Sequence, residues 1–154
     1  MRLWHKDLIP YLPRQQLVSQ WREVCFIAND WAMTGTPNHI LVNEIMNYPI
    51  QHFVSYCNMI FVEMGLRGYR IMPNSLSRLN VNIKLIDRGE HPESGLIVGI
   101  HGWVNSDIYS NWHNDRYLLQ CYFNLEEKYD RGGMSDDEWD RIEIFCSSEL
   151  EYLL

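Results

Sequence analysis

Apolar residues recur at helical spacing through segment 48–67, and this pattern sets the fold class of the 154-residue chain. The segment starts beside Pro49 and is followed by Gly68, which are ordinary boundary residues of a helix. A helix this apolar needs cover on most of its sides, so it should be the central one. Its buried stripe consists of Ile50, Phe53, Val54, Cys57, Phe61 and Met64. The sequence therefore predicts a mainly α-helical fold.

Three more segments carry the same period. One covers 13–28 and begins next to two prolines, a second covers 114–130, and a third starts at 135 with "SDDE", a capping box of Ser135 and Glu138. The stretch 29–39 is predicted to be a loop, and the weak alternation within 80–104 indicates a short β-hairpin. We expect a compact single-domain fold of about four helices: a body over 1–131 and an acidic C-terminal helix over 132–154, packed on it or extending it.

The net charge of −7 is concentrated at one end of the chain. Residues 1–125 carry ten Lys/Arg and ten Asp/Glu, whereas residues 126–154 carry three and ten. A pI of 5.3 is unusual for a protein that binds phosphates unaided, although a balanced body can still present a basic face. No apolar run approaches the roughly 18 residues of a membrane span, and no signal peptide is apparent. We expect a cytoplasmic protein without a membrane partner.

Signatures of metal and cofactor chemistry are missing from the sequence. The four cysteines form no CxxC pair and are expected to be reduced core residues. The six histidines never reach HxxxH or HExxH spacing, and there is no GxxxxGK[ST], GxGxxG or GxSxG. The sequence therefore predicts a function without a metal ion or cofactor.

The segment 13–28 has a polar side with an unusual composition. On a helical projection Gln15, Ser19, Arg22 and Glu23 lie opposite the apolar stripe, and Phe26 falls among them. A solvated helix face is the simplest interpretation of such polar residues. An aromatic side chain among amides and charges instead indicates a covered or binding surface.

These residues resemble a known family. The order Leu12, Gln15, Leu17, Arg22, Glu23 resembles the first helix of the pyrimidine-dimer DNA glycosylase/AP lyases, the family of the phage UV endonuclease V. The start "MRLWHKDLIPYLPRQQL" is closer still to a branch of small bacterial and phage relatives. "FVEMGLRGY" and "HNDRYLLQCYFNLEEK" are similar to two later blocks of the family, in the right order.

The resemblance implies a DNA-repair enzyme whose nucleophile is the N-terminal amine. An α-amine has a reference pKa near 7.7–8.0, against about 10.4 for lysine, so far more of it is unprotonated at neutral pH. By this resemblance Met1 and Glu23 are the catalytic residues, acting through a Schiff base and β-elimination. Arg2, Gln15, Gln16 and Arg22 are the expected DNA-binding residues. The expected partner is damaged double-stranded DNA, with a pyrimidine dimer or an abasic site, bound by a monomer.

Three departures from the family pattern are visible, the first being an acidic C-terminal helix beyond the family's usual end together with an expanded region over 72–112. Arg2 is a bulky second residue, which predicts that Met1 is retained and supplies the amine. Phe26 stands where the founding enzyme has a further basic residue.

An alternative interpretation is a non-catalytic binding module on the same scaffold, whose acidic tail contacts a basic protein. A metal-dependent nuclease is a third interpretation. Catalysis requires the N-terminus near Glu23 and a basic face, whereas a nuclease requires clustered His and Asp/Glu.

Overall fold

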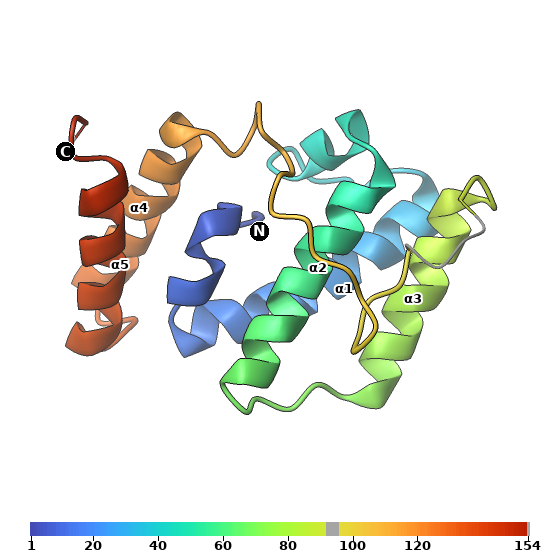
Figure 1. Cartoon of the computed structure of the whole chain (residues 1–154), viewed down its shortest axis with the longest axis horizontal. Helices are drawn as coiled ribbons and strands as arrows, with labels where there is room; N and C mark the ends of the chain where they lie inside the picture. Colours follow the sequence, from blue (N-terminus) through green and yellow to red (C-terminus); the bar gives the residue numbers. More distant parts are fainter. Residues whose placement is uncertain (92–95, 154) are drawn as a thin grey trace.

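The computed structural model describes residues 1–91 and 96–153, and within them all regular structure is helical (Figure 1). This confirms the mainly α-helical fold class. In chain order the elements are the 3-10 helix η1 (Lys6–Tyr11), α1 (Arg14–Thr34), the 3-10 helix η2 (Asn43–Asn47), α2 (Ile50–Leu66), α3 (Pro73–Asp87), α4 (Asp115–Asp130) and α5 (Asp136–Glu149).

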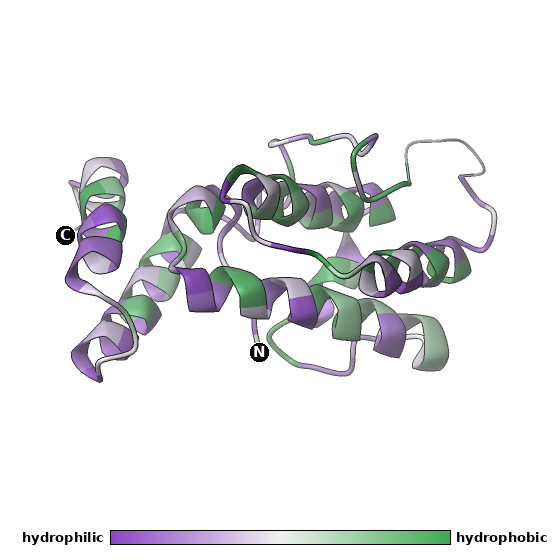
Figure 2. Ribbon diagram, turned by 90° about the horizontal axis from the view of Figure 1, so that it is seen from below, coloured by the Kyte–Doolittle hydropathy of each residue, from purple (hydrophilic) through white to green (hydrophobic). Residues whose placement is uncertain are grey.

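The helices form two groups with the start of the chain between them. Helix α1 packs against both α2 and α3, while α4 and α5 lie side by side at the other end of the molecule (Figure 1). The N-terminal segment and η1 fill the space between the two groups. Figure 2 shows hydrophobic and hydrophilic positions alternating around each helix, as expected for helices that bury one side. Residues 3–5 are therefore buried in the fold, whereas Met1 stays partly exposed.

Helix α1 runs six residues beyond the predicted end at 28. Trp31 packs edge-on against Phe53 with ring centroids 5.8 Å apart, and the Thr34 hydroxyl donates to the Asp30 carbonyl at 2.8 Å. The helix ends at Gly35, whose φ of 83° is left-handed and suits glycine. The loop predicted from Asn29 onward therefore begins only at the glycine.

The predicted β-hairpin over 80–104 is wrong. Its first arm belongs to α3, which opens with Pro73 at its first turn and buries Leu79, Asn82, Ile83 and Asp87. This is helical spacing, and the alternation of "NVNIKLI" conceals it because the window is only seven residues long. The predicted turn falls partly on residues 92–95, which lie outside the described residues.

The second arm, 96–104, is irregular chain with a turn in which the Gly102 N–H donates to the Gly99 carbonyl at 2.8 Å, and it has no strand partner among the described residues. Asn80 binds Val98 twice, donating to its carbonyl at 2.9 Å and accepting from its N–H at 2.9 Å. Asn58 likewise donates to the Ile97 carbonyl and accepts from the Gly99 N–H at 3.1 Å. Side-chain amides thus satisfy the backbone groups that a second strand would otherwise pair.

Helix α5 packs against both α4 and η1. Its capping box is formed as predicted, and Trp139, Ile142, Cys146 and Leu150 are buried at its base. Phe145 stacks on Tyr11 of η1 with centroids 4.3 Å apart. The acidic helix therefore contributes to the hydrophobic core as well as to the surface.

Two sequence expectations concern the whole chain. All four cysteines are free; Cys57, Cys121 and Cys146 are buried as predicted, whereas Cys25 is only partly buried. In the part of the chain that the structure describes, no helix combines the length and apolarity that a membrane crossing requires.

Candidate active site at the N-terminus

Gln20 fastens the first residues of the chain to α1. Its side chain is completely buried, and its Oε1 accepts from the Trp4 backbone N–H at 2.8 Å while its Nε2 donates to the Arg2 carbonyl at 2.9 Å. The buried Tyr56 hydroxyl of α2 lies 2.8 Å from Gln20 Oε1 and 2.7 Å from the Trp4 carbonyl. Residues 2–4 are thereby held in one conformation against two helices.

The same amide orients Glu23. Gln20 Nε2 also donates to Glu23 Oε2 at 2.9 Å. Burial raises the pKa of the half-buried Glu23 carboxyl, and the N-terminal amine, Lys128, Gln20 and the Arg2 backbone oppose this rise by favouring the charged form. The Arg2 carbonyl and the Glu23 carboxylate accept from the same Gln20 nitrogen, so the N-terminal segment and Glu23 are neighbours. A carboxyl with a raised pKa is suited to both accepting and returning a proton.

A pocket of about 350 Å³ opens beside this carboxylate, and we call it the Glu23 hollow. Its buried Gln16 has an Oε1 atom without a hydrogen-bond partner. Two cations, Lys128 and Arg131, reach it from the end of α4. The hollow combines an acid, unpaired amide groups and basic side chains, and is lined by Trp4, Gln15, Gln16, Ser19, Glu23, Lys128, Arg131 and Gly133.

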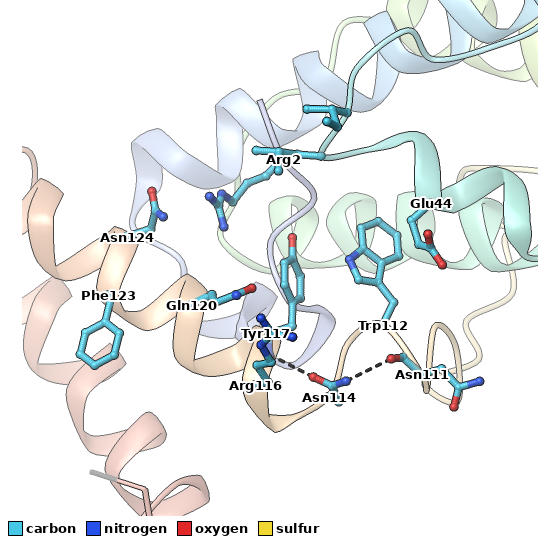
Figure 3. Close-up of a pocket in the computed structure, with 12 residues that line it drawn as sticks. Arg2, Glu44, Asn111, Trp112, Asn114, Arg116, Tyr117, Gln120, Phe123 and Asn124 are labelled. Atoms are coloured by element: carbon cyan, nitrogen blue, oxygen red, sulfur yellow. Dashed lines mark hydrogen bonds between the residues drawn. The ribbon is translucent and has the colours of Figure 1, made fainter.

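A larger pocket of about 740 Å³, the Arg2 hollow, lies against the N-terminal segment (Figure 3). Figure 3 shows Tyr117 and Gln120 projecting from α4 and Trp112 from the preceding connection. The Tyr117 hydroxyl donates to the Leu3 carbonyl, which adds a further anchor for the segment. Arg2 also lies over the Trp4 ring, 5.6 Å from its centroid.

A basic strip follows the outer side of α1. The Glu23 hollow shares Gln15 and Ser19 with a neighbouring hollow, and that hollow shares Val18 and Arg22 with a third. Only two carboxylates line the three hollows, Glu23 and Glu138, against five cations, Arg14, Arg22, Arg70, Lys128 and Arg131. The protein thus has a locally positive surface although its net charge is −7.

The residues predicted for the site fall into two neighbouring places. Gln15, Gln16 and Glu23 share the Glu23 hollow, and Arg22 lies further along the strip. Arg2 instead lines the larger hollow, and Met1 is 47% exposed. Gln15 and Arg22 are exposed as the helical projection indicates, whereas Gln16 is buried.

Sequence reasoning missed Gln20 and Tyr56. The sequence did contain a signal for each of them, because each polar side chain occupies a position on the otherwise apolar side of its helix. Lys128 and Arg131 were missed for another reason: they are more than 100 residues from Glu23 in the chain, and only tertiary packing brings them to it.

The motif "FVEMGLRGY" holds the fold together around the site. Arg67 pairs with Glu63 at 2.8 Å and donates to the Leu12 carbonyl at 2.7 Å and the Pro10 carbonyl at 3.1 Å. It joins the end of α2 to the turn between η1 and α1. The motif therefore positions the start of α1, from which the site is built.

One group of potential metal ligands occurs in the described residues, at the end of α3. The ligand atoms of Asp87, Glu90 and His91 lie within 4.8 Å of one another. Asp87 and His91 already bind each other at 2.7 Å, and none of the three lines a hollow described above. This group therefore gives the metal-dependent nuclease no support at the Glu23 hollow.

Comparison with known proteins bears on the family. The family model for pyrimidine dimer DNA glycosylase matches residues 1–76, from the N-terminal segment into α3. No curated protein and no solved structure gives a significant match. The matched part contains Arg2, Gln20, Glu23, Tyr56 and Arg67, which form and support the site. Residues 1–76, just under half of the chain, are thus similar to the pyrimidine dimer DNA glycosylases, and this similarity supports a DNA glycosylase role in repair.

Proposed function

We propose that the protein is a DNA glycosylase/AP lyase that acts on damaged double-stranded DNA through its N-terminal amine. The observation that carries this proposal is the Gln20 clamp, which holds residues 2–4 and the Glu23 carboxylate together beside a hollow. An amine beside a carboxyl of raised pKa has the parts needed for Schiff-base chemistry.

In the first stage the unprotonated Met1 amine attacks C1′ of the damaged nucleotide. The bond from C1′ to the base breaks, and the base leaves with the bonding electrons. Glu23 in its charged form stabilises the positive charge that develops on the sugar. Loss of the amine proton and opening of the sugar ring then produce a Schiff base between C1′ and the N-terminal nitrogen.

In the second stage the strand is cut by β-elimination. Removal of a proton from C2′ forms a C1′–C2′ enamine, and the electrons expel the phosphate from C3′. Glu23 exchanges the protons, a role that its raised pKa supports. Water finally hydrolyses the imine and releases the amine for another turnover.

The basic strip along α1 would bind the phosphates. Five cations against two carboxylates provide a local attraction for DNA that the overall charge does not. Arg22 lies on this strip, and Lys128 and Arg131 lie at the Glu23 hollow. We expect the DNA to follow α1, with the damaged nucleotide at Glu23.

Borohydride trapping tests the proposal. The protein, with a free N-terminus verified by mass spectrometry, is incubated with a duplex carrying one abasic site and with borohydride, which reduces an imine to a stable adduct. We expect a covalent protein–DNA adduct whose modified peptide begins at residue 1. An N-terminal extension should abolish it. No adduct on abasic or UV-irradiated duplex would overturn the lyase and favour the non-catalytic binding module.

A further inference from the structure

The third hollow on the basic strip is an apolar groove of about 330 Å³ between α1 and the start of α3. Its floor is made by buried Trp21 and Met64. Its rim carries Phe26, which is 63% exposed, and Met72, which is 57% exposed. Large apolar side chains gathered around an open groove mark a surface that is covered in use. We call it the Phe26 groove.

The charges at this groove select the kind of ligand. Arg22 and Arg70 both line it, and no carboxylate does. Within the described residues neither arginine forms an ion pair or a side-chain hydrogen bond, so both guanidinium groups are free to bind an anion. A ligand that fits must combine a flat apolar face with negative charge. A nucleotide within a DNA strand has this chemistry.

The groove is also within one nucleotide of the reacting centre. Phe26 follows Glu23 by three residues on α1, which places their Cβ atoms roughly 5–6 Å apart. Successive nucleotides of one DNA strand are about 3.4 Å apart along the duplex axis. The nucleotide adjoining the one held at Glu23 can therefore reach the Phe26 ring. This spacing favours DNA over an acidic protein partner, since only DNA is expected to occupy the Glu23 hollow at the same time.

We propose that the Phe26 groove is a second DNA site, in which Phe26 stacks on the base next to the damaged nucleotide while Arg22 and Arg70 bind its flanking phosphates. The inference rests on the proposed function, since it names the part of the DNA that this surface holds. Stacking on an aromatic ring tolerates any base, because every base has a flat π-face. The site would thus hold the strand beside a lesion whatever its sequence.

The test measures binding of Phe26→Ala, Phe26→Trp and Arg70→Gln to a duplex with a stable abasic-site analogue. The matched control is Trp103→Ala, which removes another aromatic side chain that is 61% exposed and lines none of the hollows. We expect roughly ten-fold weaker binding for Phe26→Ala, with the salt dependence unchanged. Phe26→Trp should restore affinity. Arg70→Gln should weaken binding and lower the slope of log K against log salt by about one.

The outcomes separate this inference from the proposed function. If the wild-type protein forms the borohydride adduct but Phe26→Ala binds within two-fold of wild type, the groove is not a DNA site and the lyase stands. If Trp103→Ala weakens binding as much as Phe26→Ala, loss of any exposed aromatic explains the effect and the inference fails. A wild-type protein that neither binds the duplex nor forms the adduct overturns both.

Discussion

Gln20 joins four groups of the candidate site through one amide. It accepts from Trp4 and contacts Tyr56 with its oxygen, and it donates to Arg2 and Glu23 with its nitrogen. Because the amide is buried, water cannot replace the hydrogen-bond partners of its oxygen and nitrogen. The position of the N-terminal segment and the orientation of the Glu23 carboxylate are therefore linked through this residue.

A comparison of two variants, one at Gln20 and one at its neighbour Tyr56, gives a first prediction. Gln20→Met removes the donor to Glu23, whereas Tyr56→Phe leaves that donor in place and removes only the Tyr56 hydroxyl group. Both variants should slow adduct formation, because displacing a reacting group by about 1 Å can cost 100-fold. Only Gln20→Met should also raise the pKa of Glu23 further and move the acid limb of the rate profile to higher pH. Identical profiles for the two variants would contradict a positioning role.

Glu23 supplies a second prediction, with opposite effects on activity and stability. Its raised pKa means that the folded protein binds this proton more readily than the unfolded chain does, so stability falls as pH rises above about 4.5. Glu23→Gln keeps the acceptor for Gln20 and removes the buried charge. It should abolish strand cleavage, yet unfold in urea at the same or a higher concentration than wild type at pH 7.5. The difference should narrow at pH 4.5; a variant that is less stable at both pH values would show that the carboxylate stabilises the fold.

Helical periodicity predicts some residues of the site but not all of them. Arg22 and Glu23 follow from the projection of one helix, since exposure on α1 depends mainly on local geometry. Gln20 could have been found by the same projection as a polar residue on the buried side. Lys128 could not, because its place beside Glu23 depends on how α4 packs.

At the scale of elements, amide side chains replace a strand. The segment 96–104 reads as β because it is apolar and glycine-rich, but its backbone groups are paired with Asn58 and Asn80. A side chain added at Gly102 would overlap Asn58, with its Cβ only 2.1 Å from the Oδ1 atom. Sequence periodicity cannot distinguish a strand from an irregular segment whose backbone is paired by side-chain amides, since both leave the same apolar pattern.

Helix α5 gives the third prediction, which separates its packing from its charge. Deleting 132–154 removes seven of the ten acidic residues in 126–154, but also Trp139, Ile142 and Phe145. We expect the truncated protein to be insoluble or to lose cooperative unfolding, because η1 and α4 lose their cover.

The charge alone is tested by combining Asp137→Asn, Asp140→Asn and Glu143→Gln, all at exposed positions of α5. This triple variant should keep the wild-type melting behaviour and bind duplex DNA more tightly at low salt, with the difference vanishing at high salt. A soluble, cooperative truncated protein would show instead that α5 is dispensable to the core.

At the scale of the whole molecule, the start of the chain is enclosed by segments more than 100 residues away. The His5 Nε2 atom lies 2.8 Å from the His113 carbonyl, and the Lys6 N–H donates to His113 Nδ1 at 2.9 Å. The imidazole rings stack with centroids 5.2 Å apart. Helical periodicity predicts the helices, but the way in which the two helix groups enclose the first residues follows from these long-range contacts alone.

This histidine pair predicts that acid destabilises the fold. Burial lowers the pKa of His5, although Asp7 and Asp115 oppose it, and burial together with His5 and Lys6 lowers the pKa of His113 to about 2. Each ring therefore stays neutral in the folded protein at a pH where the unfolded chain binds a proton. The free energy of unfolding has its full value above pH 6.5, the pKa of histidine in the unfolded chain. Below that pH it falls by up to about 1.4 kcal/mol per pH unit for each ring.

Urea unfolding between pH 7.5 and pH 5 measures this loss, and His113→Asn is the matched variant because Asn Oδ1 can still accept from the Lys6 N–H. The variant should be less stable than wild type at pH 7.5, since it leaves a cavity beside Tyr56 and Tyr117. Its stability should nevertheless fall less steeply as the pH is lowered, by about one bound proton. Adduct formation should decline over the same range, because acid weakens the contacts that enclose the N-terminal segment. Parallel pH profiles for the two proteins would show that His113 does not carry the acid sensitivity.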